Sequence, residues 1–181
     1  LGPLVAKRGY AKVSMPGGCA IGDRPVDLHL RGLRALGAEI TLDEGDITAR
    51  SPKGGKGRLK GARIFLGGPF GSTVLGTANV MSAATLAEGT TTIESAACEP
   101  EVVDLANMLI GMGAKIHGAG SPRITIEGVE SLSGVTHRVI PDRIEAGTYM
   151  CAAAITNGDI TLDNCPVDAL MAVVDQLEAI G

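Results

Sequence analysis

Aromatic residues are scarce in this sequence, and tryptophan is absent. The 181 residues include two Phe and two Tyr, which leaves few side chains on which nucleic-acid bases could stack. The formal net charge of -4 also lacks the basic excess that is typical of nucleic-acid-binding proteins. We therefore expect no nucleic-acid partner, and we expect any anionic substrate to be held by a few local cations.

Long apolar runs and clustered metal ligands are missing too. No apolar run approaches the roughly 20 residues that cross a bilayer, and residues 1–10 lack the ordered regions of a signal peptide. Four cysteines are present, without a CxxC pair or a zinc-type cluster with histidine; they are Cys19, Cys98, Cys151 and Cys165. The sequence thus predicts a cytoplasmic protein with reduced thiols, no metal and no membrane partner. We expect Cys98, Cys151 and Cys165 to be buried as small apolar residues.

Small and aliphatic residues are plentiful. Hydrophobic residues make up 45% of the chain, and glycine occupies 26 positions. Ala, Val, Ile and Leu fall in periodic segments, which indicates a closely packed α/β core rather than disorder. The sequence does not begin with Met, and residues 177–181 read as the end of a helix. We therefore expect both ends to be internal to a longer protein.

An internal repeat indicates the architecture more firmly than local propensity does. Residues 81–94 align without gaps on residues 150–163. Each copy is typical of a small-residue helix, a glycine stop and an alternating strand. The predicted unit is helix, strand, helix, strand, strand over about 70 residues, with two full-sized copies and part of a third.

Three amphipathic helices mark the same repeat. Their apolar faces follow helical spacing and consist of Val26, Leu30, Leu33 and Leu36, then Val102, Leu105, Leu109 and Met112, then Leu170, Val173, Leu177 and Ile180. A proline stands at or near each predicted helix start, at Pro25, Pro100 and Pro166. Gly37 and Gly113 predict the ends of the first two helices. A seam of glycine and proline at residues 118–122 predicts a boundary between domains 1–120 and 121–181.

A glycine-rich loop surrounds Cys19. Residues 16–25 read Pro-Gly-Gly-Cys-Ala-Ile-Gly-Asp-Arg-Pro, and its glycines allow the backbone to approach a ligand closely. Arg24 and the helix N-terminus that follows are groups of the kind that activate a thiol and bind phosphate. These features predict a reactive thiol, and the alternative interpretation is a turn with an incidental cysteine.

Residues 16–29 closely resemble the active-site loop of UDP-N-acetylglucosamine enolpyruvyl transferases. Further segments match in the family's order and extend the resemblance to essentially the whole chain; they are residues 1–5, 84–90, 97–101, 141–148 and 158–164. The resemblance implies the α/β (α+β) fold of the EPSP synthase superfamily. This fold is a two-globe inside-out α/β barrel, or prism, in which each globe holds three repeated units.

The activity that the resemblance implies is transfer of the enolpyruvyl group of phosphoenolpyruvate to the 3'-hydroxyl of UDP-N-acetylglucosamine, with release of phosphate. In this family the reaction is the first committed step of peptidoglycan synthesis. The resemblance therefore also implies a role in cell-wall biogenesis, cell shape and cell division, with fosfomycin as an inhibitor. It implies no metal and no organic cofactor, and the two small molecules are the expected partners.

Two catalytic residues follow from the resemblance. Cys19 matches the loop cysteine, which in the family protonates the enolpyruvyl methylene and forms a covalent adduct with phosphoenolpyruvate. A thiol suits both roles because its thiolate is a nucleophile and its neutral form is a proton donor. Asp142 matches the acid that acts as general base beside the sugar hydroxyl. Without the resemblance, an Asp before an Arg in a turn is usually structural.

Substrate-binding residues are implied in the same way. They are Arg24, Pro25, Val26, Asp27, Leu28, Ser72, Thr73, Val74 and Asn164, with Glu99, Glu101, Arg123 and Arg143 as supporting polar residues of an interdomain cleft. The guanidinium of Arg24 offers the fork that a phosphate accepts. The alternative interpretations are a solvated arginine at Arg24 and a first-turn helix acid at Asp27.

The sequence departs from the family pattern at two places. Gly71 stands where the family has a nucleotide-contacting Lys, and Pro122 precedes Arg123 where an Asp-Arg pair is usual. Several family Lys, Asn and Arg residues also have no counterpart in this chain, so we expect no turnover from the chain alone. The alternatives are a non-catalytic nucleotide-sugar-binding homologue and a 5-enolpyruvylshikimate-3-phosphate synthase, which lacks the cysteine loop.

Overall fold

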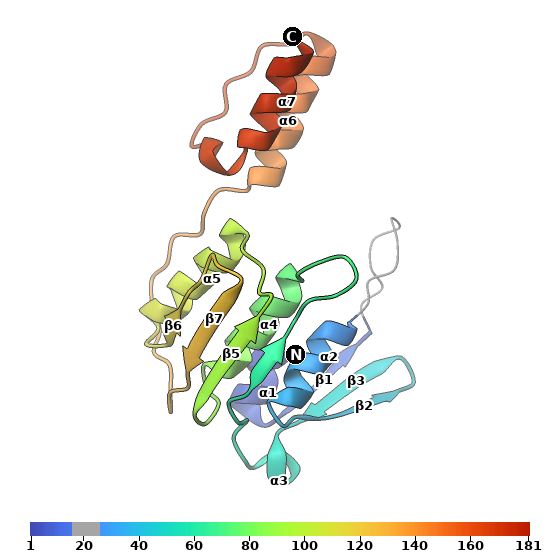
Figure 1. The fold of residues 1–181 in the computed structure, drawn as a ribbon, viewed down its shortest axis with the longest axis vertical. Coiled ribbons are helices and arrows are strands. Elements are labelled where there is room, and N and C mark those ends of the chain that lie inside the picture. Colours follow the sequence, from blue (N-terminus) through green and yellow to red (C-terminus); the bar gives the residue numbers. More distant parts are fainter. Residues whose placement is uncertain (16–25) are drawn as a thin grey trace. The chain divides into compact units, whose positions relative to one another are not determined.

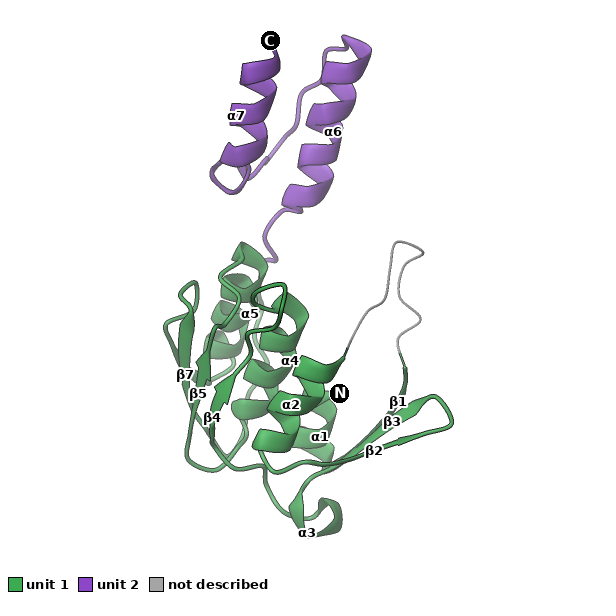
Figure 2. Cartoon of the chain, turned by 45° about the vertical axis from the view of Figure 1, so that its right-hand side comes forward, with its two compact units in different colours: residues 1–137 green, residues 138–181 purple. Residues whose placement is uncertain are grey.

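The structure is a computed structural model that describes residues 1–15 and 26–181. The chain divides into two compact units, unit 1 (Leu1–His137) and unit 2 (Arg138–Gly181), which are coloured separately in Figure 2. Unit 1 mixes helices with strands that are mostly antiparallel (Figure 1). The α+β class predicted from the sequence is therefore confirmed.

The predicted repeat is present twice in unit 1. The first copy contains α1 (Gly2–Arg8), β1 (Tyr10–Ser14), α2 (Asp27–Ala35), β2 (Glu39–Asp43) and β3 (Asp46–Arg50). The second contains α4 (Val74–Ala84), β5 (Thr90–Glu94), α5 (Pro100–Gly111), β6 (Lys115–His117) and β7 (Arg123–Glu127). In each copy the last strand lies antiparallel between the other two, in the orders β1-β3-β2 and β5-β7-β6. The shared strand order confirms the repeat.

A connecting segment joins the two copies. It contains the short helical segment α3 (Pro52–Gly55) and the strand β4 (Arg63–Phe65). The strand pairs parallel with β5, so that Ile64 lies beside Ile93 and the second sheet has the order β4-β5-β7-β6. On the inner face of this sheet, Ile93 is paired with Ile124, and both are fully buried. Because successive side chains of a strand point to opposite faces of the sheet, every second residue faces the core.

The helices α2 and α5 end in the same way. Gly37 and Gly113 both adopt positive φ, at 88° and 103°. In α2 the N–H of Gly37 donates to the Arg34 carbonyl, and the N–H of Ala38 donates to the Leu33 carbonyl. The equivalent pair follows α5. This paired capping by a left-handed glycine is the Schellman motif, and it confirms the predicted ends of both helices.

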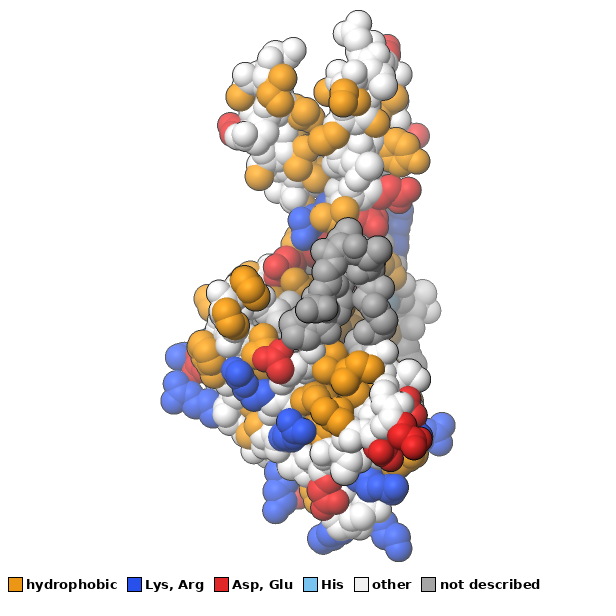
Figure 3. Space-filling view, turned by 90° about the vertical axis from the view of Figure 1, so that its right-hand side faces the viewer, with side chains coloured by type: hydrophobic (Ala, Val, Ile, Leu, Met, Phe, Trp, Pro, Cys, Tyr) orange, Lys and Arg blue, Asp and Glu red, His pale blue; other side chains and the backbone are white. Residues whose placement is uncertain are grey.

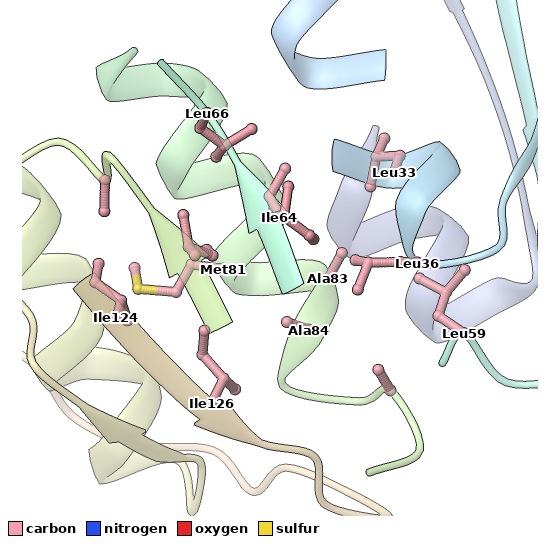
Figure 4. Packing of buried hydrophobic residues seen from close by; sticks show 14 of the residues in the cluster. Leu33, Leu36, Leu59, Ile64, Leu66, Met81, Ala83, Ala84, Ile124 and Ile126 are labelled. Atoms are coloured by element: carbon pink, nitrogen blue, oxygen red, sulfur yellow. The ribbon is translucent and has the colours of Figure 1, made fainter. Parts of the chain in front are cut away.

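The core of unit 1 is centred on α4. Figures 1 and 2 show α1, α2 and α4 between the two sheets, and Figure 4 shows Met81, Ala83 and Ala84 of α4 among the side chains of both copies. The two helices α2 and α4 approach closely at Gly32, where an added Cβ would lie 2.3 Å from a methyl group of the fully buried Val80. Small residues are therefore needed for these helices to pack.

Unit 2 is made of α6 (Arg143–Thr156), a 3-10 turn (Val167–Ala169) and α7 (Met171–Ile180). The alternating strand predicted within residues 150–163 is not formed, because no described residue of 138–181 is a strand that could pair with it. The predicted glycine stop also differs, since Asn157 rather than Gly158 takes the left-handed conformation that ends α6. Leu170 is the hydrophobic side chain that unit 2 buries, and it packs against Gly147.

Several large hydrophobic side chains of unit 2 are exposed. Hydrophobic side chains cover much of what Figure 3 shows of it, and Ile144, Ile155 and Ile180 are each more than 60% exposed. The third predicted amphipathic helix is therefore only partly realised: Leu170 is buried and Val173 and Leu177 are half-buried, whereas Ile180 is exposed. Two helices without a sheet leave little room for a core.

The predicted seam at residues 118–122 is the turn between β6 and β7 inside unit 1. The chain remains attached to unit 1 beyond β7, since the N–H of Val129 donates to the Thr85 carbonyl at 2.8 Å. The Nε2 atom of His137 lies 2.9 Å from Oδ1 of Asp104 on α5. The division between the compact units therefore falls after His137. Assignment of the two parts to separate globes of a larger protein stays a prediction.

Candidate functional site

Three predicted substrate-binding residues lie at the start of α2. Val26 is the residue before the helix, Asp27 is its first residue and is exposed, and Leu28 is half-buried. Cys19, Arg24 and Pro25 lie outside the described residues. The carboxylate of Asp27 stands in the first turn, where it complements the positive end of the helix dipole.

A second group of predicted binding residues lies in the loop from β4 to α4. The side-chain hydroxyl of Thr73 accepts the N–H of Gly76 at 3.1 Å and so caps α4. Ser72 is exposed, and Val74 is half-buried as the first residue of the helix. These three residues thus define the N-terminal end of α4.

The loop and α2 are in direct contact. A Cβ added to Gly68 of the loop would lie 3.1 Å from Cδ1 of Leu28, and the guanidinium of Arg31 donates to the Gly67 carbonyl at 3.4 Å. The structure therefore brings Leu28 and Ser72–Val74, which are far apart in the sequence, to the same end of unit 1.

Asn79 connects α2 and α4 behind this surface. Its Oδ1 accepts the N–H of Gly2 at 2.7 Å, and its Nδ2 lies 3.3 Å from Nδ1 of His29. Burial is the main cause that lowers the pKa of His29 below its ordinary value of 6.5; the α-amino group of Leu1 adds to this, and Asp27 opposes it. The neutral ring can accept a hydrogen bond from Asn79. No sequence motif marks His29 or its partner Asn79.

Three of the four supporting residues proposed from the sequence lie at the start of α5 and on β7. Glu99 precedes α5, and its Oε2 atom is buried without a hydrogen-bond partner among the described residues. Glu101 lies in the first turn of α5. On β7, Arg123 donates through Nε to Glu94, and this hydrogen bond is the main cause that lowers the pKa of the Glu94 carboxyl. Arg123 thus takes part in an ion pair on the outer face of the sheet.

In unit 2, Asp142 and Asn164 line one pocket of about 270 Å³. Its walls come from the start of α6 and from the segment after that helix; the lining residues are Pro141, Asp142, Glu145, Ala146, Tyr149, Thr161, Leu162, Asp163, Asn164, Cys165 and Pro166. Asn164 adopts positive φ at 56°, a conformation that asparagine tolerates better than most residues. The structure therefore joins two residues that the sequence proposed separately.

Asp142 is held by the helix that follows it. Its Oδ1 accepts the N–H of Ile144 at 2.8 Å and that of Glu145 at 3.0 Å, which satisfies two donors at the start of α6. Asp142 therefore has a structural role as the cap at the start of α6, as an Asp in this position commonly does. Arg143 is the first residue of α6. A carboxylate fixed through one oxygen still has a second oxygen with which to accept a proton.

The pocket contains further polar residues that sequence reasoning did not select. Glu145 and Tyr149 lie one and two turns beyond Asp142 on the same face of α6, and Asp163 precedes Asn164. The helical spacing of residues 142, 145 and 149 is the sequence signal that could have placed them on one face of a helix. Three of the lining residues are acids and none is Lys or Arg. The pocket therefore offers hydrogen-bond acceptors to hydroxyl and amide groups and does not offer a cation to a phosphate.

The prediction that three cysteines are buried is wrong. Cys98 and Cys151 are exposed, and Cys165 is half-buried at the wall of the pocket. Cys98 lies in the turn before α5, and Cys151 lies on α6, where unit 2 has no sheet to cover it. Residues 1–15 and 26–181 contain no group of three His, Cys, Asp or Glu side chains placed to hold a metal ion. The same residues form no helix that is long and apolar enough to span a membrane.

Solved structures define the class to which this fold belongs. The chain is similar to the enolpyruvyl transferase NikO from Streptomyces tendae, with a TM-score of 0.66 and 26% identity over 83% of this chain and 35% of that chain. It is also similar to the EPSP synthase from Acinetobacter baumannii, with a TM-score of 0.59 and 25% identity over 84% of this chain and 32% of that chain. The fold is that of enolpyruvyl transferases.

The family follows from the sequence comparison. Residues 1–181 match the EPSP synthase (3-phosphoshikimate 1-carboxyvinyltransferase) family, and the chain belongs to this family. It is 54% identical over 181 residues to the UDP-N-acetylglucosamine 1-carboxyvinyltransferase of Methylacidiphilum infernorum (isolate V4). It is 55% identical to the proteins of the same name from Akkermansia muciniphila and Halothermothrix orenii. The chain spans 42% of the length of each of these relatives.

Proposed function

We propose that this chain is part of an enzyme that transfers the enolpyruvyl group of phosphoenolpyruvate to the 3'-hydroxyl of UDP-N-acetylglucosamine. The observation that carries the proposal is the identity of 54–55% over all 181 residues to three proteins named for this activity. We further propose that the enzyme is cytoplasmic and acts in peptidoglycan synthesis. Through that synthesis it would contribute to cell shape and cell division.

The chemistry of the pocket in unit 2 supports a sugar as one substrate. Asp142, Glu145, Asp163 and Asn164 line it together, and their oxygens match the hydroxyl and amide donors of an N-acetylated sugar. The absence of Lys and Arg among these described lining residues favours the sugar over the phosphates. The phosphates are therefore assigned to cations elsewhere in the enzyme, including Arg24.

The proposed reaction proceeds by addition and elimination. Asp142 takes the proton of the 3'-hydroxyl as the sugar oxygen attacks C2 of phosphoenolpyruvate, and Cys19 delivers a proton to C3. The Cys19 thiolate then takes a proton back from C3, which restores the double bond and expels inorganic phosphate, and the phosphate leaves with the proton that Asp142 accepted. Atoms and charges balance without a redox partner or a metal-bound intermediate. Cys19 has this role because residues 16–25 match the family's loop.

Fosfomycin provides a direct test of the thiol. Because the chain spans 42% of its relatives, the test uses the reading frame extended to their length. After treatment with fosfomycin, mass spectrometry should locate one alkylated residue at Cys19, and UDP-N-acetylglucosamine should change the rate of alkylation. Cys98 and Cys151 are exposed thiols and serve as internal controls. Equal labelling of all three cysteines would contradict the assignment.

A non-catalytic homologue that binds a nucleotide sugar is the second candidate. The observation that favours it is Gly71, which stands where the family has a nucleotide-contacting Lys. This candidate predicts binding of UDP-N-acetylglucosamine without alkylation of Cys19 and without phosphate release. A 5-enolpyruvylshikimate-3-phosphate synthase is disfavoured because such enzymes lack the cysteine loop.

A further inference from the structure

Phe70 is almost completely exposed. The chain has two Phe residues, and Phe70 shows 98% of its surface to solvent, more than any other large hydrophobic side chain among the described residues. An aromatic ring without apolar contacts forgoes the stabilisation that burial provides. A ring in this state is available to a ligand.

The backbone that carries Phe70 is braced. Gly68 and Gly71 exchange two hydrogen bonds, of 2.8 Å and 3.1 Å, across a tight turn whose two central residues are Pro69 and Phe70. The proline restricts the turn further, and Arg31 of α2 holds the preceding carbonyl of Gly67. The backbone that carries the ring is therefore restricted before any ligand arrives, which lowers the entropic cost of binding.

The turn lies between the two groups of predicted substrate-binding residues in unit 1. Leu28 contacts Gly68 at one side of the turn, and Ser72 and Thr73 follow it directly on the other side. Figure 1 shows the loop into α4 at the end of unit 1 where α2 begins. Gly71, the last residue of the turn, stands where the resemblance implies a nucleotide-contacting Lys.

We propose that Phe70 stacks on the base of the nucleotide substrate and takes over the contact that the missing Lys makes in related proteins. The inference rests on the proposed function, because the ligand it names is the uridine nucleotide of that reaction. An aromatic side chain binds a base through its π-face, whereas a Lys binds through charge. The binding of the base should therefore depend weakly on salt concentration.

A single-tryptophan variant makes the contact visible. The chain contains no Trp, so Phe70→Trp introduces one fluorophore at the proposed site. UDP should quench its fluorescence, and inorganic diphosphate, which has no base, should leave it unchanged. Phe65→Trp is the matched control, because Phe65 is the other Phe, is 61% exposed and belongs to β4; its fluorescence should not respond. No response of Phe70→Trp to UDP, or an equal response to diphosphate, overturns the inference.

Kinetics separate this inference from the function on which it rests. In the protein extended to the length of its relatives, Phe70→Ala should raise the KM for UDP-N-acetylglucosamine by about tenfold and leave the KM for phosphoenolpyruvate unchanged. Phe65→Ala should change neither. If the wild-type protein turns over and Phe70→Ala has an unchanged KM, the stacking role is wrong and the function stands. If UDP quenches Phe70→Trp but the wild-type protein does not turn over, the stacking role stands and the function is wrong.

Discussion

The Oδ1 atom of Asp142 accepts the backbone N–H of Ile144 at 2.8 Å. The same oxygen accepts the N–H of Glu145, so the proposed general base is also the N-cap of α6. The cap holds this carboxylate in place at the pocket that Asp142 and Asn164 line together. One side chain therefore has a structural and a proposed chemical role, and suitable substitutions can separate the two.

Asp142→Asn and Asp142→Ala should differ in stability but not in activity. Asparagine keeps an oxygen that caps the helix, whereas alanine removes it and should cost about 1 kcal/mol. Both variants lack a carboxylate that can accept a proton, so both should lose turnover in the protein extended to the length of its relatives. Urea denaturation measures the first difference, and phosphate release measures the second. An active Asp142→Asn variant would remove Asp142 from the mechanism.

Gly32→Ala should destabilise unit 1 although alanine is the better helix former. The added methyl group would lie 2.3 Å from Cγ2 of Val80, which is fully buried, and overpacking of this kind costs about 1–3 kcal/mol. The change should cost less in a Val80→Ala background, which a double-mutant cycle detects. Gly134→Ala is the control, since no atom lies within 4 Å of its added Cβ. Equal denaturation midpoints for the two alanine variants would contradict the packing described for α2 and α4.

The buried ring of His29 should make stability depend on pH. Burial lowers its pKa in the folded state below the ordinary value of 6.5. Above this value the ring is neutral in both states, and stability does not depend on His29. As the pH falls below it, the unfolded chain binds the proton first, so the free energy of unfolding decreases until the pH reaches the folded pKa.

Urea denaturation between about pH 8 and about pH 5 measures this effect. His29→Gln keeps an oxygen that can accept the hydrogen bond from Asn79, and it does not titrate. The variant should therefore lose less stability than the wild-type protein as the pH falls. Parallel pH profiles for the two proteins would show that His29 binds a proton as readily in the fold as in the unfolded chain.

The 181-residue chain should release no phosphate by itself. The resemblance implies several Lys, Asn and Arg residues for which this sequence has no counterpart, and the chain spans 42% of its relatives. A colorimetric phosphate assay with both substrates tests this. Release that requires both phosphoenolpyruvate and UDP-N-acetylglucosamine would show that the missing residues are dispensable.

The repeat could be predicted from the sequence because local signals agreed with the tertiary structure. Gly37 and Gly113 follow helices with apolar stripes, and both adopt the left-handed conformation that their position requires. The stripe that includes Leu33 and the one that includes Val102 face the core. Pro100 likewise begins α5 as predicted. These features depend on neighbours within a few residues, so they are visible in the sequence.

Features that depend on distant partners could not be predicted. The strand expected near Ile160 needs a second strand, and the described residues of unit 2 supply none. Pro166 precedes a 3-10 turn rather than the start of α7. Burial of Cys98 and Cys151 was expected from residue type alone and failed, because exposure depends on what packs against each element. The contact of Leu28 with Gly68 is likewise invisible in the sequence.

Phosphate release is the most direct test of the central claim. The protein extended to the length of its relatives is supplied with phosphoenolpyruvate and either UDP-N-acetylglucosamine or shikimate 3-phosphate. The account predicts release that requires phosphoenolpyruvate and UDP-N-acetylglucosamine together and is lost in Cys19→Ser and Asp142→Asn. Binding of UDP-N-acetylglucosamine without phosphate release, or release that requires shikimate 3-phosphate instead, would contradict it.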